Sequence, residues 1–137
     1  MVAYFVPKHI TKQEIYSTAL FSLTLGLLSD ITLDLKYDLY GYFEKGLQLK
    51  GFLAIVGLFP ASGILFLNFY PQKKSLLHKI FYIIIWTVFC LLYEWTAIKS
   101  GFFYHNGWNF WYSTLSYPIL LWIHILHLLF IRFLKYK

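Results

Sequence analysis

The composition of this 137-residue chain excludes an ordinary soluble domain, because 59% of its residues are hydrophobic and only 13% are charged. The formal net charge of +6 does not indicate nucleic-acid binding, since the lysines and arginines are scattered over connections and ends instead of gathering on one face. Cys90 is the only cysteine, which excludes a disulfide within the chain.

Four apolar stretches take up most of the chain, and we place them at 16–35, 51–70, 80–98 and 114–134. A helix of about 20 residues, rising about 1.5 Å per residue, crosses the roughly 30 Å of hydrocarbon in a bilayer. The sequence therefore predicts an all-α fold, in which four transmembrane helices form an integral membrane bundle and residues 1–137 make a single transmembrane domain.

The first stretch carries small and acidic side chains at every fourth position. Residues four apart lie on nearly the same face of an α-helix, so we expect this row to face the other helices and not lipid, where an ionised side chain is costly. In the second stretch, Gly57 and Ala61 have the spacing of a close helix contact. The row of the first stretch consists of Thr18, Ser22, Gly26, Asp30, Asp34 and Asp38.

Two carboxylates, Asp30 and Glu94, each lie fourteen residues after the start of a predicted span. We expect them to share a level in the outer third of the membrane and to approach each other inside the bundle. Two carboxylates that approach closely cannot both stay ionised without a cation, so one of them would bind a proton. Two interpretations stay open: the acids form a proton or cation site, or they hydrogen-bond across helices and hold the bundle together.

The connection between the third and fourth stretches, 99–113, has seven aromatic residues in fifteen positions. We expect it to lie over the bundle, with a turn at Asn106-Gly107. Its aromatic cap would consist of Trp108, Trp111 and Tyr112, and a simple aromatic belt at the interface is the alternative. His105 would lie above Asp34 and is a candidate, with the acids of the first helix, for a weak outer cation site.

The fourth stretch carries two histidines, His124 and His127, at a spacing that can supply two metal ligands. A metal site needs a third and usually a fourth ligand within reach, and the carboxylates lie at a different depth. We therefore predict that these histidines are hydrogen-bonded or face the cytoplasm, with no metal and no cofactor.

Charge in the connections predicts the orientation of the bundle. If the chain crosses the membrane four times, eight cationic residues lie on the side of the two termini and four lie on the other side. Positively charged residues are retained in the cytoplasm, so both termini are predicted to be cytoplasmic. The eight are Lys8, Lys12, Lys73, Lys74, Lys79, Arg132, Lys135 and Lys137, and the four are Lys36, Lys45, Lys50 and Lys99.

The acidic first span and the region after Glu94 carry a resemblance to a known family. The segment GLLSDITLDLKYDLYGYF is similar to that family's acidic first helix, and after Glu94 the pattern continues with Gly101-Phe102-Phe103, His105, Trp108 and Tyr112-Ser113. From about Gly26 to its end the chain resembles a family of small, uncharacterised multi-pass membrane proteins from spore-forming Gram-positive bacteria. The resemblance implies architecture and membrane location, and it makes Asp30, Glu94, His105 and Trp108 signature positions. The chain departs from the pattern by its extra acids Asp34 and Asp38.

These observations favour a multi-pass protein of the cell membrane that is not an enzyme. Its proton- or cation-binding candidates are Asp30, Asp34, Glu94 and His105. One alternative is a small proton- or cation-coupled transporter that acts as a homo-oligomer, although we expect the cytoplasmic half of the bundle to be mostly apolar, which counts against a transport path. Another is a lipid-directed enzyme that uses acid–base chemistry. The expected partners are the lipid bilayer and a second copy or another membrane protein, with no nucleic acid.

Overall fold

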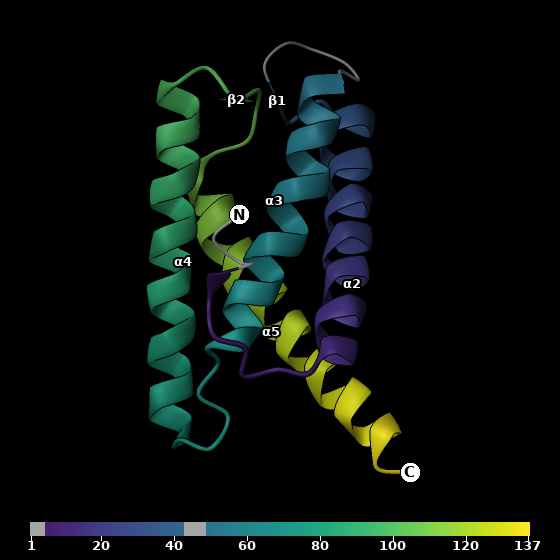
Figure 1. The fold of residues 1–137 in the computed structure, drawn as a ribbon. Coiled ribbons are helices and arrows are strands. Elements are labelled where there is room, and N and C mark those ends of the chain that lie inside the picture. Colours follow the sequence, from purple (N-terminus) through teal and green to yellow (C-terminus); the bar gives the residue numbers. More distant parts are fainter. Residues whose placement is uncertain (1–4, 43–48) are drawn as a thin grey trace.

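Four long helices form the body of the protein in the computed structural model, which describes residues 5–42 and 49–137 (Figure 1). They are α2 (Lys12–Asp30), α3 (Leu49–Asn68), α4 (Leu76–Lys99) and α5 (Phe110–Lys135), and a π-helical segment, η1 (Ile31–Lys36), continues α2. All four are long and apolar enough to cross a membrane, which confirms the predicted helical architecture.

Three helices, α2, α4 and α5, begin four residues before the predicted spans, because their first turns contain polar or aromatic residues that interrupt an apolar stretch. Thr11 caps α2 and forms a capping box with Glu14, whose carboxylate accepts a hydrogen bond from the Thr11 backbone N–H at 2.7 Å. Asn109 caps α5, since its side-chain oxygen accepts hydrogen bonds from the backbone N–H groups of Trp111 and Tyr112.

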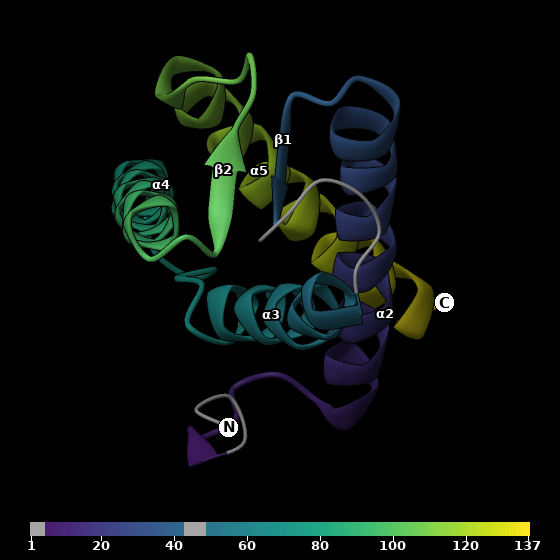
Figure 2. The same ribbon diagram turned by 90° about the horizontal axis from the view of Figure 1, so that it is seen from above.

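Two short strands join the connections at one end of the bundle, and the sequence analysis did not predict them. β1 (Tyr40–Tyr42) pairs with β2 (Phe103–His105) in an antiparallel ladder, with Tyr40 opposite His105. Seen from above, the strands lie between α2 and α4 (Figure 2). We call β1, β2 and residues 106–109 the cap. The predicted turn is found here: Gly107 has φ +95, and Asn106 donates to the backbone and side-chain oxygens of Asp38. Glu44 and Lys45 lie outside the described residues.

The buried face of α2 is the four-residue row, although its limits differ from the prediction. The buried residues of α2 are Glu14, Thr18, Ser22, Gly26 and Asp30. The row thus starts one step earlier than predicted and stops before Asp34 and Asp38, which are only partly buried. The cause is the change to π-helical hydrogen bonding at Ile31, which breaks the α-helical repeat.

Close packing of α2 against α3 depends on glycine, because a Cβ on Gly26 would overlap the ring of Phe59 and one on Gly63 would overlap the Ser22 hydroxyl. The predicted close contact at Gly57 is wrong: a Cβ there would meet nothing within 4 Å in the described part of the chain.

Buried apolar packing concentrates in the half of the bundle away from the cap, where Phe66, Leu67, Ile125 and Leu128 form a core cluster. Large apolar side chains elsewhere, such as Phe89 on α4, stay exposed on the outer faces of the helices. Such faces suit a lipid environment.

Candidate functional site

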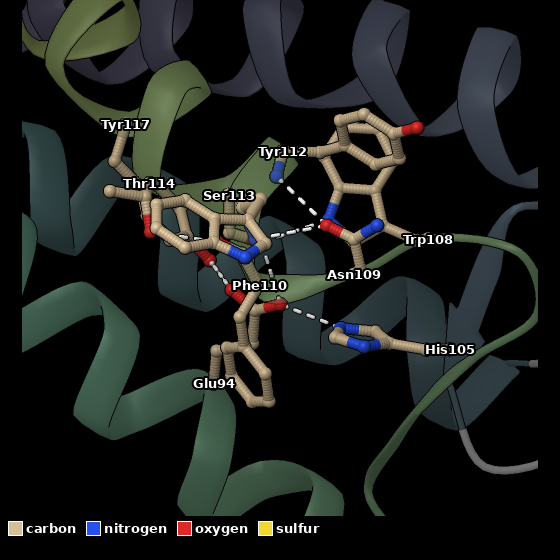
Figure 3. Close-up of polar contacts among 10 residues, drawn as sticks. Glu94, His105, Trp108, Asn109, Phe110, Tyr112, Ser113, Thr114 and Tyr117 are labelled. Atoms are coloured by element: carbon tan, nitrogen blue, oxygen red, sulfur yellow. Dashed lines mark hydrogen bonds and ion pairs between the residues drawn. The ribbon is translucent and has the colours of Figure 1, made fainter.

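The carboxylate of Glu94 is the centre of a closed hydrogen-bond network beneath the cap (Figure 3). Glu94 lies on α4 and is only 4% exposed. Its Oε1 accepts from His105 Nε2 at 2.6 Å and from Ser113 Oγ at 2.8 Å, while Oε2 accepts from the Tyr117 hydroxyl at 2.6 Å. One acid on α4 is therefore tied both to β2 and to the first two turns of α5.

The direction of these hydrogen bonds follows from the donors. The indole N–H of Trp108 can only donate, and it lies 2.8 Å from Ser113 Oγ. Ser113 therefore accepts from Trp108 and uses its own proton to donate to Glu94. An ionised carboxylate only accepts hydrogen bonds, and each of the three groups around Glu94 can donate one.

The start of α5 places the two donors of that helix on one side. Ser113 and Tyr117 are four residues apart and so share a face. The Asn109 cap fixes the first turn of α5, and Figure 3 shows Asn109, Ser113 and Tyr117 following one another along the helix beside Glu94.

The second acid, Asp30, is 6% exposed and accepts a hydrogen bond from the Tyr40 hydroxyl at 2.9 Å. Tyr40 lies opposite His105 in the strand pair, and directly opposite residues of antiparallel strands project to the same face of the sheet. The two strands thus present one donor to each acid: Tyr40 to Asp30 on α2, and His105 to Glu94 on α4.

The predicted site residues do not form a single cluster in the structure. Asp30 and Glu94 both lie beneath the cap, and the hydrogen bonds described above join each of them to the cap instead of to the other acid. Asp34 lies in η1, away from the buried row, and His105 is bound to Glu94. Among the described residues, no group of three or more His, Cys, Asp or Glu side chains could hold a metal ion.

The aromatic residues that pack together at the cap differ from the predicted set of Trp108, Trp111 and Tyr112. The Trp108 ring packs edge-on against Tyr40, with 5.6 Å between ring centroids, and lies tilted against Tyr112 at 5.3 Å. Tyr40 also contacts Phe103, with 5.2 Å between their ring centroids. Trp111, by contrast, is 77% exposed.

Sequence reasoning missed three partners of the acids: Tyr40, Ser113 and Tyr117. The four-residue spacing of Ser113 and Tyr117 was a usable signal, because it places two hydroxyls on one helix face. Tyr40 became a partner only through the strand pairing of two distant connections, for which three-residue strands give almost no pattern.

A second polar cluster, also missed, lies at the opposite end of the bundle. Glu14 on α2 is 4% exposed and accepts from Arg132 Nε on α5 at 2.6 Å. Arg132 also donates to the Gln72 side chain in the connection between α3 and α4. Nearby, Asn68 accepts from the His9 backbone N–H at 2.7 Å. The bundle is therefore fastened by buried polar groups at both ends.

No protein-family model, curated protein or solved structure matches this chain. The family resemblance noted in the sequence therefore stays a prediction, and the geometry of the site carries the functional argument.

Proposed function

We propose that this protein is a non-enzymatic, multi-pass component of the cell membrane whose buried acids fasten an extracellular cap to the helix bundle. The observation that carries the proposal is that three donors hydrogen-bond to the buried Glu94 carboxylate, two from α5 and one from the cap. Both termini face the cytoplasm in this proposal, as the distribution of cationic residues predicts.

The energetics support a fastening role. A carboxylate removed from water is costly unless hydrogen bonds or opposite charge compensate for the lost solvation. Glu94 receives that compensation from His105, Ser113 and Tyr117, and it loses the His105 donor if the cap lifts away from α4 and α5. The cap and the ends of α4 and α5 are therefore coupled through one residue.

A second candidate function, proton binding coupled to transport, is favoured by one specific contact. The His105 side chain is 17% exposed while the Glu94 side chain is 3% exposed. His105 thus connects the buried carboxylate with the surface of the cap, and histidine is the side chain best suited to exchange protons near neutral pH.

Two substitutions of Glu94 test the fastening role. Glu94→Leu leaves one buried and two partly buried donors without an acceptor and is expected to lower the free energy of unfolding by about 3–5 kcal/mol. Glu94→Gln keeps a carbonyl acceptor and is expected to cost about 1 kcal/mol. Thermal unfolding in detergent measures both, and Asp34→Asn, which alters a partly buried acid on η1, is the matched control. If Glu94→Leu unfolds like Asp34→Asn, the fastening role is wrong.

Proton flux into liposomes separates the two candidate functions. The fastening role predicts no flux above that of empty liposomes, for the wild-type protein and for Glu94→Gln alike. Flux that the wild-type protein supports and that Glu94→Gln abolishes, at unchanged thermal stability, would instead establish the transport function.

A further inference from the structure

The contacts between α2 and α5 below the cap include a polar site that the fastening role does not use. Ser22 Oγ lies 2.9 Å from His124 Nε2, and Glu14 lies 2.6 Å from Arg132. The two contacts are separated by eight residues on each helix, so α2 and α5 run antiparallel in a fixed register. In that register Thr18 lies halfway between the two contacts, at the level of His127 and Leu128.

Two buried polar atoms at this level have no hydrogen-bond partner among the described residues. They are Thr18 Oγ1, on a side chain that is 0% exposed, and His127 Nε2. A buried polar atom left without a partner is destabilising, and ordered water is its usual partner in proteins. Two independent groups, on two helices, thus point to water between α2 and α5.

The two histidines belong to one site. His124 Nδ1 lies 2.8 Å from the Leu120 carbonyl oxygen, which can only accept, so Nδ1 carries a proton and Nε2 of the neutral ring accepts from Ser22. The His127 ring stacks on Phe21 at 4.1 Å, and the same Phe21 ring meets His124 edge-on at 5.4 Å.

A groove of about 480 Å³ opens at the end of the bundle opposite the cap. It runs between the start of α2 and the end of α5, and its lining includes Glu14, Ser17, Ile131 and Lys135. Ser17 directly precedes Thr18 in the sequence, and Ile131 follows His127 by about one helical turn. The groove lining is therefore one residue from Thr18 in the sequence and one helical turn from His127, so the groove lies on the approach to this level of the two helices.

Toward the cap, the polar row is interrupted. Gly26 is the next member of the buried row after Ser22, and the Phe59 ring of α3 fills the space above it so closely that a Cβ would overlap the ring. An aromatic side chain thus separates Ser22 and His124 from Asp30.

We propose that α2 and α5 enclose a hydrated histidine site, formed by Thr18, Ser22, His124 and His127, that binds water and exchanges protons with the side of the membrane onto which the groove opens. Phe59 closes the site toward Asp30. The charged groups on the groove side are Glu14 and Arg132, which form an ion pair with each other, and Lys135, which lines the groove together with Glu14. This half of the bundle was expected to be mostly apolar, and the proposal gives it a polar interior reached from one side only.

Exchange of the histidine ring C–H with D₂O, followed by mass spectrometry of the full-length wild-type protein between pH 5 and 9, tests the site directly. His78, exposed near the start of α4, is the internal reference. We expect His127 to exchange within about tenfold of His78 and with a sigmoidal pH dependence. A His127 rate more than about a hundredfold below that of His78, with no pH dependence, would mean a dry site and would overturn the proposal.

Two variants test the path and its closure. Ser17→Phe fills the groove and should slow the exchange of His127 about tenfold without changing His78, whereas Leu20→Phe, on an exposed face of α2, should change neither. Phe59→Ala should raise passive proton leak through liposomes above that of the wild-type protein. Unchanged His127 exchange in Ser17→Phe would contradict the groove as the path, and equal leak in Phe59→Ala would contradict the role of Phe59.

Discussion

Ser113 joins the indole of Trp108 to the carboxylate of Glu94 through one hydroxyl that both accepts and donates. Ser113→Ala would leave the Trp108 N–H without its acceptor and would remove one of the three donors to Glu94. We expect a loss of about 2 kcal/mol in the free energy of unfolding, because an unpaired buried polar group costs more than the hydrogen bond itself contributes. Chemical denaturation in detergent measures this loss.

Thr114→Ala is the control at the neighbouring residue, because the Thr114 hydroxyl only donates to the Phe110 carbonyl oxygen within α5. We expect it to change stability by less than about 0.5 kcal/mol. The indole ¹H–¹⁵N signal of Trp108, assigned through Trp108→Phe, should shift in Ser113→Ala and stay in place in Thr114→Ala. A Trp108 signal that stays in place in Ser113→Ala would show that Ser113 is not its acceptor.

At the scale of elements, the contact of α2 with α3 is set by the absence of a side chain at Gly26. Gly26→Ala places a methyl group against the Phe59 ring, and we expect this overpacking to cost about 1–3 kcal/mol despite the better helix propensity of alanine. Thermal unfolding compares it with Gly57→Ala, where the new methyl meets open space and helix propensity should stabilise by about 0.5–1 kcal/mol.

Phe59→Leu should restore part of the stability lost in Gly26→Ala, because a smaller side chain leaves room for the methyl group. A double-mutant cycle gives the coupling between the two positions. If the two substitutions are additive, the clash is not with Phe59.

The sequence was sufficient for the helices because each apolar stretch is long and continuous, and helix position depends on local pattern. It also predicted that Thr18, Ser22, Gly26 and Asp30 share a buried face, which is confirmed. The π-helical segment that ends this face is a local change of hydrogen bonding with no composition signal, so the row was extended too far, to Asp38.

The partners of the acids were less accessible to prediction, for two physical reasons. Each strand of the cap has three residues, and pairing between connections more than 60 positions apart is decided by tertiary packing and not by local propensity. Glu14 was overlooked because an acid in the first turn of a helix is ordinary capping chemistry, whereas here it is also the buried partner of Arg132.

At the scale of the whole molecule, polar groups lie in two layers on either side of Phe59. The layer beneath the cap contains Asp30 and Glu94, whose partners come from the strands and from α5. The lower layer contains His124 and His127 and is approached by the groove from the other end. The two ends of the bundle therefore differ in chemistry, so in a membrane the orientation of the bundle would decide which compartment each layer faces.

Two serines at opposite ends of α4, Ser75 and Ser100, allow that orientation to be measured. Both are exposed, and the 24 residues of α4 between them span about 36 Å at 1.5 Å per residue. In a Cys90→Ser background, Ser100→Cys and Ser75→Cys each provide a single thiol by a conservative change that leaves every lysine in place.

The distribution of lysines predicts the result. Arg132 is left out of the comparison because it is paired with Glu14 and Gln72. Seven lysines are then at the Ser75 end against four at the cap end, so the Ser75 end should be retained in the cytoplasm. A membrane-impermeant maleimide should therefore label Ser100→Cys on intact cells and Ser75→Cys only after permeabilisation. The reverse pattern would place the histidine site on the outer side and the cap inside, and labelling of both variants on intact cells would contradict a single orientation.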